Sequence, residues 1–208
     1  MEEAAPYPRF LSHGRCFAYV LPCRFEDLLK VGFTRDPLRR LHALHRRYFD
    51  FFDLDRALLI EVPRVREARA IERTVIVELV ELRAPAPLVV RRAAGGHTEW
   101  YRGAAAAIDV ALPRLLASSG GQLHAPLRHW LRSEFQGFSD QLWQWSLMLI
   151  EAVEYEAHNL PSEAQRGLAA SSLRHVLDSC VVLDFDLSRL VPARVLDWYA
   201  NAPLFERR

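Results

Sequence analysis

Two short β-prone runs near the N-terminal end constrain the fold of this chain most strongly. Residues 17–21 and 28–34 are mainly apolar, and the six-residue segment between them predicts a β-hairpin with a longer loop. Asp36 and Pro37 follow the second run; aspartate often caps a helix and proline is favoured at the first helical position. The sequence therefore predicts a hairpin that leads into a helix.

The pattern continues beyond this helix with a third strand and further helices. Residues 56–62 are typical of a strand, whereas residues 64–82 repeat apolar side chains at helical spacing. Another helix is expected over residues 104–116. We therefore predict an α+β fold for residues 1–117, with a small antiparallel three-stranded sheet flanked by helices.

A Ser-Ser-Gly-Gly break at residues 118–121 divides the chain, and beyond it the sequence predicts helices rich in aromatic residues. The 208 residues suit two small domains, which we expect at 1–117 and 118–208, the second mainly helical. Residues 1–117 contain 19 basic and 15 acidic side chains, a net charge of +4, and the remainder is net −3. This excess favours a polyanionic partner for the first half, although a mixed solvated surface would give a similar balance.

Targeting signals and membrane segments are not predicted. The N-terminus lacks the basic stretch and apolar run of a secretory signal, and no apolar segment approaches the roughly 18 residues of a membrane span. Three cysteines, without a CxxC pair, fit a reducing compartment better than a disulfide framework. We expect a cytoplasmic protein that contacts no membrane.

Several short motifs occur in an order that resembles the GIY-YIG nuclease superfamily. The first and second tripeptides of that family correspond to Phe17-Ala18-Tyr19 and Lys30-Val31-Gly32. Arg40 and Glu72 stand on the first and second helices at the positions of the family's arginine and metal-binding glutamate. Glu99-Trp100-Tyr101 resembles the closing motif of the phage-associated subgroup. The resemblance covers about half of the chain and depends on the joint order of the motifs.

This resemblance implies catalytic roles for Tyr19, Lys30, Arg40 and Glu72. Glu72 would bind one Mg²⁺ or Mn²⁺, and Arg40 would clamp the scissile phosphate. Tyr19 would act as the general base or orient the attacking water. The structural alternatives are a surface glutamate paired with neighbouring arginines, a solvated helix arginine and a tyrosine packed in the sheet.

Five further residues are candidates for substrate binding: Gly32, Arg39, His42, Arg46 and Arg47. Gly32 would allow the backbone and a phosphate to approach closely, although glycine also ends strands for plain steric reasons. The basic side chains lie on or near the first helix and would contact DNA. A solvated helix surface is the alternative for these arginines and for His42.

Lys30 and Phe17 depart from the family pattern, in which tyrosine and glycine occupy these positions. Lys30 is the only lysine among 27 basic residues, the other 26 being arginine. Lysine can lose its proton when it is desolvated beside other cations, whereas arginine cannot. A proton-accepting or phosphate-touching role next to Arg40 would explain this single lysine, and chance retention would leave the same pattern.

The leading hypothesis is a metal-dependent endonuclease that hydrolyses DNA phosphodiester bonds. The alternative is a nuclease-fold binding module, either a DNA-binding regulator or a protein-interaction subunit, and the two departures and the weak positive charge favour it. The acidic helical region 118–208 would then pack on the first domain, bind a protein partner or form a homodimer.

Overall fold

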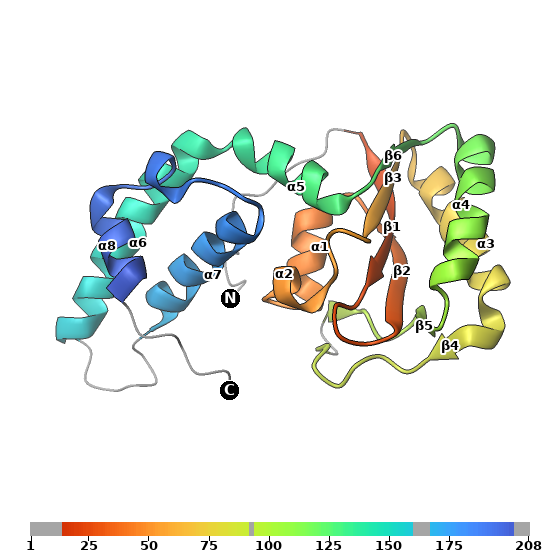
Figure 1. The fold of residues 1–208 in the computed structure, drawn as a ribbon, viewed down its shortest axis with the longest axis horizontal. Coiled ribbons are helices and arrows are strands. Elements are labelled where there is room, and N and C mark those ends of the chain that lie inside the picture. The colour runs from red at the N-terminus through yellow and green to blue at the C-terminus, as the bar shows by residue number, and fades with distance from the viewer. Residues whose placement is uncertain (1–13, 92–93, 160–166, 202–208) are drawn as a thin grey trace. The chain divides into compact units, whose positions relative to one another are not determined.

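The computed structural model describes residues 14–91, 94–159 and 167–201. The chain divides into two compact units, the first ending at Leu131 and the second beginning at Arg132 (Figure 1). The first unit thus extends past the boundary at residue 117 that the sequence indicated. The reason is that strand β6 (Gln122–His124) pairs with the central sheet and the Leu127 N–H donates to the Ala57 carbonyl oxygen.

The described part of the first unit is built on a six-stranded antiparallel sheet in the order β4-β5-β2-β1-β3-β6. β1 (Cys16–Pro22) and β2 (Leu28–Thr34) form the expected hairpin. β3 (Leu58–Val62) pairs with the other side of β1. The α+β class and these three strands are confirmed, but the prediction of a sheet with three strands was wrong.

The strands that the sequence did not indicate are short and lie toward the edges of the sheet. β4 (Arg83–Ala84), β5 (Trp100–Arg102) and β6 have only two or three residues each. Segments of this length cannot display the apolar alternation by which a strand is recognised in a sequence. They pair because the edges of the long strands present unpaired backbone groups.

Helices cover both faces of this sheet. α1 (Pro37–Leu44) begins after Asp36, whose side chain accepts a hydrogen bond from the Arg39 N–H, and α2 (Tyr48–Phe51) follows. Figure 1 shows both on one face of the sheet, with α3 (Val65–Glu78) and α4 (Ala105–Ser119) on the other. A 3-10 helix, η1 (Val80–Leu82), links α3 to β4.

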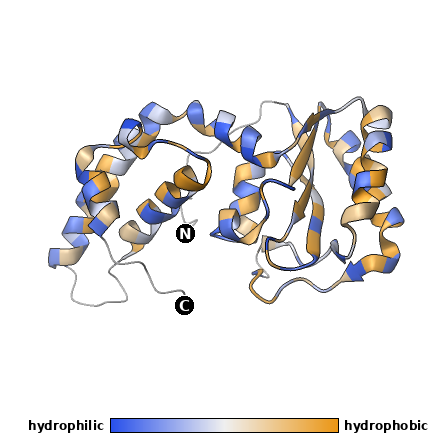
Figure 2. Ribbon diagram, in the orientation of Figure 1, coloured by the Kyte–Doolittle hydropathy of each residue, from blue (hydrophilic) through white to orange (hydrophobic). Residues whose placement is uncertain are grey.

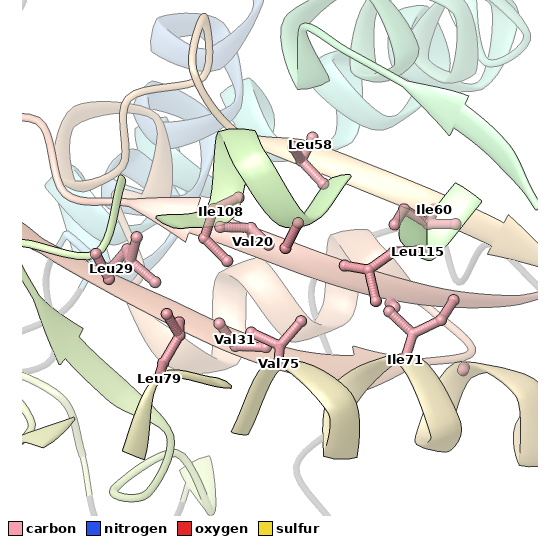
Figure 3. Packing of buried hydrophobic residues seen from close by; sticks show 14 of the residues in the cluster. Val20, Leu29, Val31, Leu58, Ile60, Ile71, Val75, Leu79, Ile108 and Leu115 are labelled. Atoms are coloured by element: carbon pink, nitrogen blue, oxygen red, sulfur yellow. The ribbon is translucent and has the colours of Figure 1, made fainter. Parts of the chain in front are cut away.

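The main hydrophobic core lies between the sheet and the helices α3 and α4. Its larger members are Val20, Leu29, Val31, Leu58, Ile60, Ile71, Val75, Leu79, Ile108 and Leu115 (Figure 3). Successive side chains of a strand point to opposite faces. Because Val20 and Val31 face this core, Tyr19, Lys30 and Gly32 face the side of the sheet that α1 covers.

The second unit is mainly helical, as predicted. α5 (Leu127–Gln136) runs across the boundary, and α6 (Ser139–Asn159), α7 (Leu168–Val182), η3 (Leu187–Arg189) and α8 (Ala193–Asn201) follow. Its buried core consists of Ile150, Leu173, Leu177, Val191 and Val195. Figure 2 shows both hydrophilic and hydrophobic residues on each of these helices. None of the helices described combines the length and apolar character needed to cross a bilayer.

Candidate functional site

Tyr19 and Arg40 form a hydrogen-bonded pair between the sheet and α1. Tyr19 is 3% exposed, and its hydroxyl oxygen accepts a hydrogen bond of 2.9 Å from the Arg40 Nε. Burial raises the pKa of Tyr19, and the Arg40 guanidinium only partly opposes this rise. Tyr19 is therefore a neutral phenol at neutral pH, and its own O–H can still donate a hydrogen bond.

The same arginine also binds the segment that precedes β5. Its Nη1 and Nη2 donate to the carbonyl oxygens of Ala94 at 2.6 Å and Gly95 at 3.3 Å. Each Nη nitrogen carries two hydrogens, so each retains one further donor. Arg39, the neighbouring residue, is exposed, and only its backbone N–H is used in the helix cap. The geometry thus distinguishes Arg40 from Arg39 as the arginine that faces the sheet.

Gly32 lies directly opposite Tyr19 in the register of β1 and β2. A Cβ atom added at Gly32 would overlap the Tyr19 ring and hydroxyl. Glycine is therefore required at this position because the Tyr19 ring lies so close. This is the steric explanation of Gly32, as opposed to close approach of a phosphate.

Lys30, the only lysine of the chain, is buried beside this pair. Its side chain is 1% exposed, and its Nζ lies 5.7 Å from the centre of the Tyr19 ring. The Nζ donates to the Val31 carbonyl oxygen and lies 3.4 Å from Oε2 of Glu99. Burial lowers the pKa of Lys30 to about 8, although the Glu99 carboxylate opposes the change. The amine therefore loses its proton far more readily than an ordinary lysine, although most of it remains charged at pH 7.

Glu99 is the member of the cluster that the sequence did not identify, since it was assigned only to a closing motif. Its backbone is left-handed, with φ of 56°, and its carbonyl oxygen accepts a hydrogen bond of 3.0 Å from the Val31 N–H. The Thr98 hydroxyl donates to Oε2 of its carboxylate. Glu99 and Lys30 lie 69 positions apart in the sequence. No local sequence pattern therefore indicates their contact.

Glu72 approaches the cluster from α3. It is partly buried, and burial together with the Glu99 carboxylate raises the pKa of Glu72, while Lys30 opposes this rise. Its carboxylate forms no hydrogen bond or ion pair within the described residues. The neighbouring Arg69 lies over the Phe33 ring at 5.2 Å. The helix-surface ion pair considered as the structural alternative for Glu72 is therefore not formed with Arg69.

Glu72 is the carboxylate of this cluster that would hold a metal ion. In the part of the chain that the structure describes, no group of three or more histidine, cysteine, aspartate or glutamate residues could hold a metal ion. Mg²⁺ is commonly bound by one or two carboxylates, with water and substrate phosphate completing its coordination. Glu72 fits that pattern, because burial and then the Glu99 carboxylate raise its pKa, and a cation would stabilise its charged form against both.

The other substrate-binding candidates differ in how exposed they are and in the contacts they make. Arg46 is exposed just beyond the end of α1, whereas His42 is partly buried. Arg47 forms a 2.6 Å ion pair with Asp50 and lies over the Phe49 ring. The structure thus brings Tyr19, Lys30 and Arg40 close to one another, while Glu72 on α3 influences them electrostatically. Arg39 and Arg46 lie on the surface.

Phe17, which the sequence resemblance marked as a departure from the expected glycine, is fully buried. Its ring meets that of Trp130 on α5 edge to face, with ring centres 5.5 Å apart, and that of His124 lies 6.4 Å away. The additional side chain is therefore accommodated by α5 and β6, which follow the elements predicted for the first domain. This departure does not disturb the position of Tyr19, which faces Gly32 two residues further along β1.

Comparisons with known proteins give one match, and it lies within the first unit. No curated protein and no solved structure shows a significant match to the chain. A match to a family model begins at Phe17 on β1 and ends within α4. It includes the elements that carry the tyrosine, lysine, arginine and two glutamates of the cluster. Residues 17–115 thus match the family of the T5orf172 domain.

Proposed function

We propose that this protein is a metal-dependent endonuclease that hydrolyses DNA phosphodiester bonds. The T5orf172 match indicates a nuclease-like or DNA-related module for residues 17–115. The observation that supports catalysis most directly is the buried Lys30 beside a tyrosine-arginine pair and two carboxylates. A purely structural core would gain stability from an apolar residue at this position, because burial of a charge is costly.

The finer assignment, to the phage-associated subgroup of the GIY-YIG superfamily, is part of this proposal. It is supported by the order of the two tripeptides on a hairpin, the helix arginine and the glutamate on α3. Their side chains also share one electrostatic environment, since Tyr19 is influenced by both Arg40 and Glu72. Lys30 stands in place of the second tyrosine, and its amine would keep a proton-accepting group at this position.

Arg40 and Tyr19 would bind the scissile phosphate. Arg40 is oriented by its bonds to Tyr19, Ala94 and Gly95, and its remaining Nη hydrogens would donate to phosphate oxygens. The Tyr19 hydroxyl, whose oxygen already accepts from Arg40, would donate its hydrogen to the same group. The pair would thus stabilise the charge that develops on the phosphate during cleavage.

Lys30 would accept the proton of the attacking water. A group whose pKa lies near the operating pH is the most effective proton acceptor. The pKa of Lys30, lowered to about 8 by burial, meets this condition better than that of Tyr19, which burial raises. The general-base role considered for Tyr19 is therefore assigned to Lys30 in this proposal.

Glu72 would hold one Mg²⁺ or Mn²⁺ together with water and substrate oxygens. When bound, this ion would supply positive charge to the phosphoryl oxygens and the leaving oxygen. The exposed Arg39 and Arg46 would contact the DNA backbone outside the cluster. Such contacts predict that binding weakens as the salt concentration rises.

Nicking of supercoiled plasmid DNA in the presence of Mg²⁺ or Mn²⁺ tests the proposal. We expect Glu72→Gln to reduce nicking at least a hundredfold, since it keeps the side-chain shape but loses the charge. Glu78→Gln is the matched control on the same helix, because Glu78 forms only a surface ion pair with Arg114 at 3.3 Å. Equal nicking by Glu72→Gln and the wild type would exclude this assignment.

The alternative function is a nuclease-fold binding module without turnover. It is favoured by the engagement of Arg40 with two backbone carbonyl oxygens and by the burial of Tyr19 and Lys30. Such a module would bind DNA in a salt-sensitive manner without nicking it, or would retain a protein partner through the second unit. Binding and nicking measured on the same DNA separate the two functions.

A further inference from the structure

Lys30 is enclosed so completely that its exchange of protons requires a neighbour. Its side chain is 1% exposed, whereas that of Glu99, at 3.4 Å from its Nζ, is 26% exposed. The other hydrogen bond of the Nζ goes to the Val31 carbonyl oxygen, which cannot carry a proton onward. The charged or titratable side chains that influence Lys30 are Glu99, Arg40 and Glu72, and Tyr19 presents its ring.

The two oxygens of the Glu99 carboxylate have different surroundings. Oε2 contacts the Lys30 Nζ and accepts a hydrogen bond from the Thr98 hydroxyl. Within the described residues, Oε1 has no protein hydrogen-bond partner. One oxygen thus faces the buried amine, while the other is left for water or substrate. A half-turn of the carboxyl group exchanges the two oxygens.

The backbone holds Glu99 in this place at an energetic cost. A non-glycine residue in the left-handed region costs about 1 kcal/mol, and asparagine, aspartate and glycine tolerate this conformation better than glutamate. The hydrogen bond from the Val31 N–H to the Glu99 carbonyl oxygen holds the backbone of Glu99 itself. The next residue, Trp100, is held by burial and by its donation to the Gly96 carbonyl oxygen at 2.6 Å.

We propose that Glu99 is the proton relay of Lys30 and carries protons between the buried amine and the accessible side of the cluster. The use of this relay in turnover rests on the proposed nuclease function. A proton released by water binds the Glu99 carboxylate and forms the carboxylic acid. The acid O–H bond then breaks as an N–H bond forms with the electron pair of the Lys30 amine. After cleavage the ammonium returns its proton to the carboxylate, which releases it to solvent.

Because Lys30 is the only lysine of the 208 residues, selective ¹⁵N labelling of lysine side chains gives a single Nζ signal in this chain. Its hydrogen exchange with water can be measured without DNA or metal. We expect Glu99→Gln to slow this exchange at least tenfold, since the amide cannot accept and release protons at neutral pH. Glu99→Asp, which retains a carboxyl group, should remain within a few-fold of the wild type, and Glu78→Gln should match it.

This measurement separates a relay from a merely structural role. If Glu99 only stabilised the cluster, its replacement would loosen the packing and accelerate exchange. Unchanged or faster exchange in Glu99→Gln, or equally slow exchange in Glu99→Asp, would overturn the proposal. The absence of DNA nicking by the wild type would refute the nuclease function but would leave the exchange result, and hence the relay, intact.

Discussion

Replacement of Lys30 by methionine should stabilise the protein while it abolishes nicking. Methionine has a similar length and is readily accommodated in a core, whereas the wild-type lysine has to be buried with its charge. A functional residue of this kind reduces the stability of the fold that contains it. The expected gain can be worked from the pKa of Lys30, which burial lowers from 10.5 to about 8.

This decrease corresponds to about 3 kcal/mol, at about 1.4 kcal/mol for each tenfold change in proton affinity. The attraction of Glu99 is already part of this shift, whereas loss of the Nζ hydrogen bond to the Val31 carbonyl oxygen offsets about 1 kcal/mol, so we expect a net gain of about 2 kcal/mol at pH 7. The unfolded chain binds more protons between pH 8 and 10.5, so the wild type regains stability as the pH rises through that window. The advantage of Lys30→Met should therefore shrink toward pH 10.

Urea unfolding of both proteins at pH 7 and pH 10, followed by circular dichroism, measures this difference. Effects of other titrating groups, such as the tyrosines, largely cancel between variant and wild type. A Lys30→Met protein less stable than the wild type at pH 7, or an advantage that does not change with pH, would refute the reasoning. It would mean that burial of the lysine is compensated within the fold and is not a cost tolerated for function.

Two further substitutions test the packing of the Tyr19 ring on Gly32 and of the Phe17 ring on Trp130. Gly32→Ala should displace the Tyr19 ring and lower the melting temperature and DNA nicking together, whereas Gly137→Ala, where an added Cβ meets only ordinary contacts, should change neither. Phe17→Ala should cost about 3–5 kcal/mol in the free energy of unfolding, because it removes a buried ring that packs on Trp130. Chemical denaturation with an unchanged midpoint would contradict this.

Local patterns were sufficient for the elements that bear most of the candidate site. The hairpin, the cap of α1 at Asp36 and the helical second unit were all predicted correctly, because each depends on neighbouring residues. The short strands were missed because two or three residues carry no periodic signal. The first compact unit ends at Leu131, beyond residue 117, because the pairing of β6 with β3 joins residues about 60 positions apart.

The sequence by itself determined the residue types of the cluster, including a lysine in a chain that otherwise uses arginine. It also determined the alternation that puts Tyr19, Lys30 and Gly32 on one face of a hairpin, because side-chain direction in a strand follows a period of two. Only the tertiary structure decided that Arg40 binds Tyr19 and that Glu99 contacts Lys30. These contacts, and the burial that lowers the pKa of Lys30, join distant segments and so have no local signature.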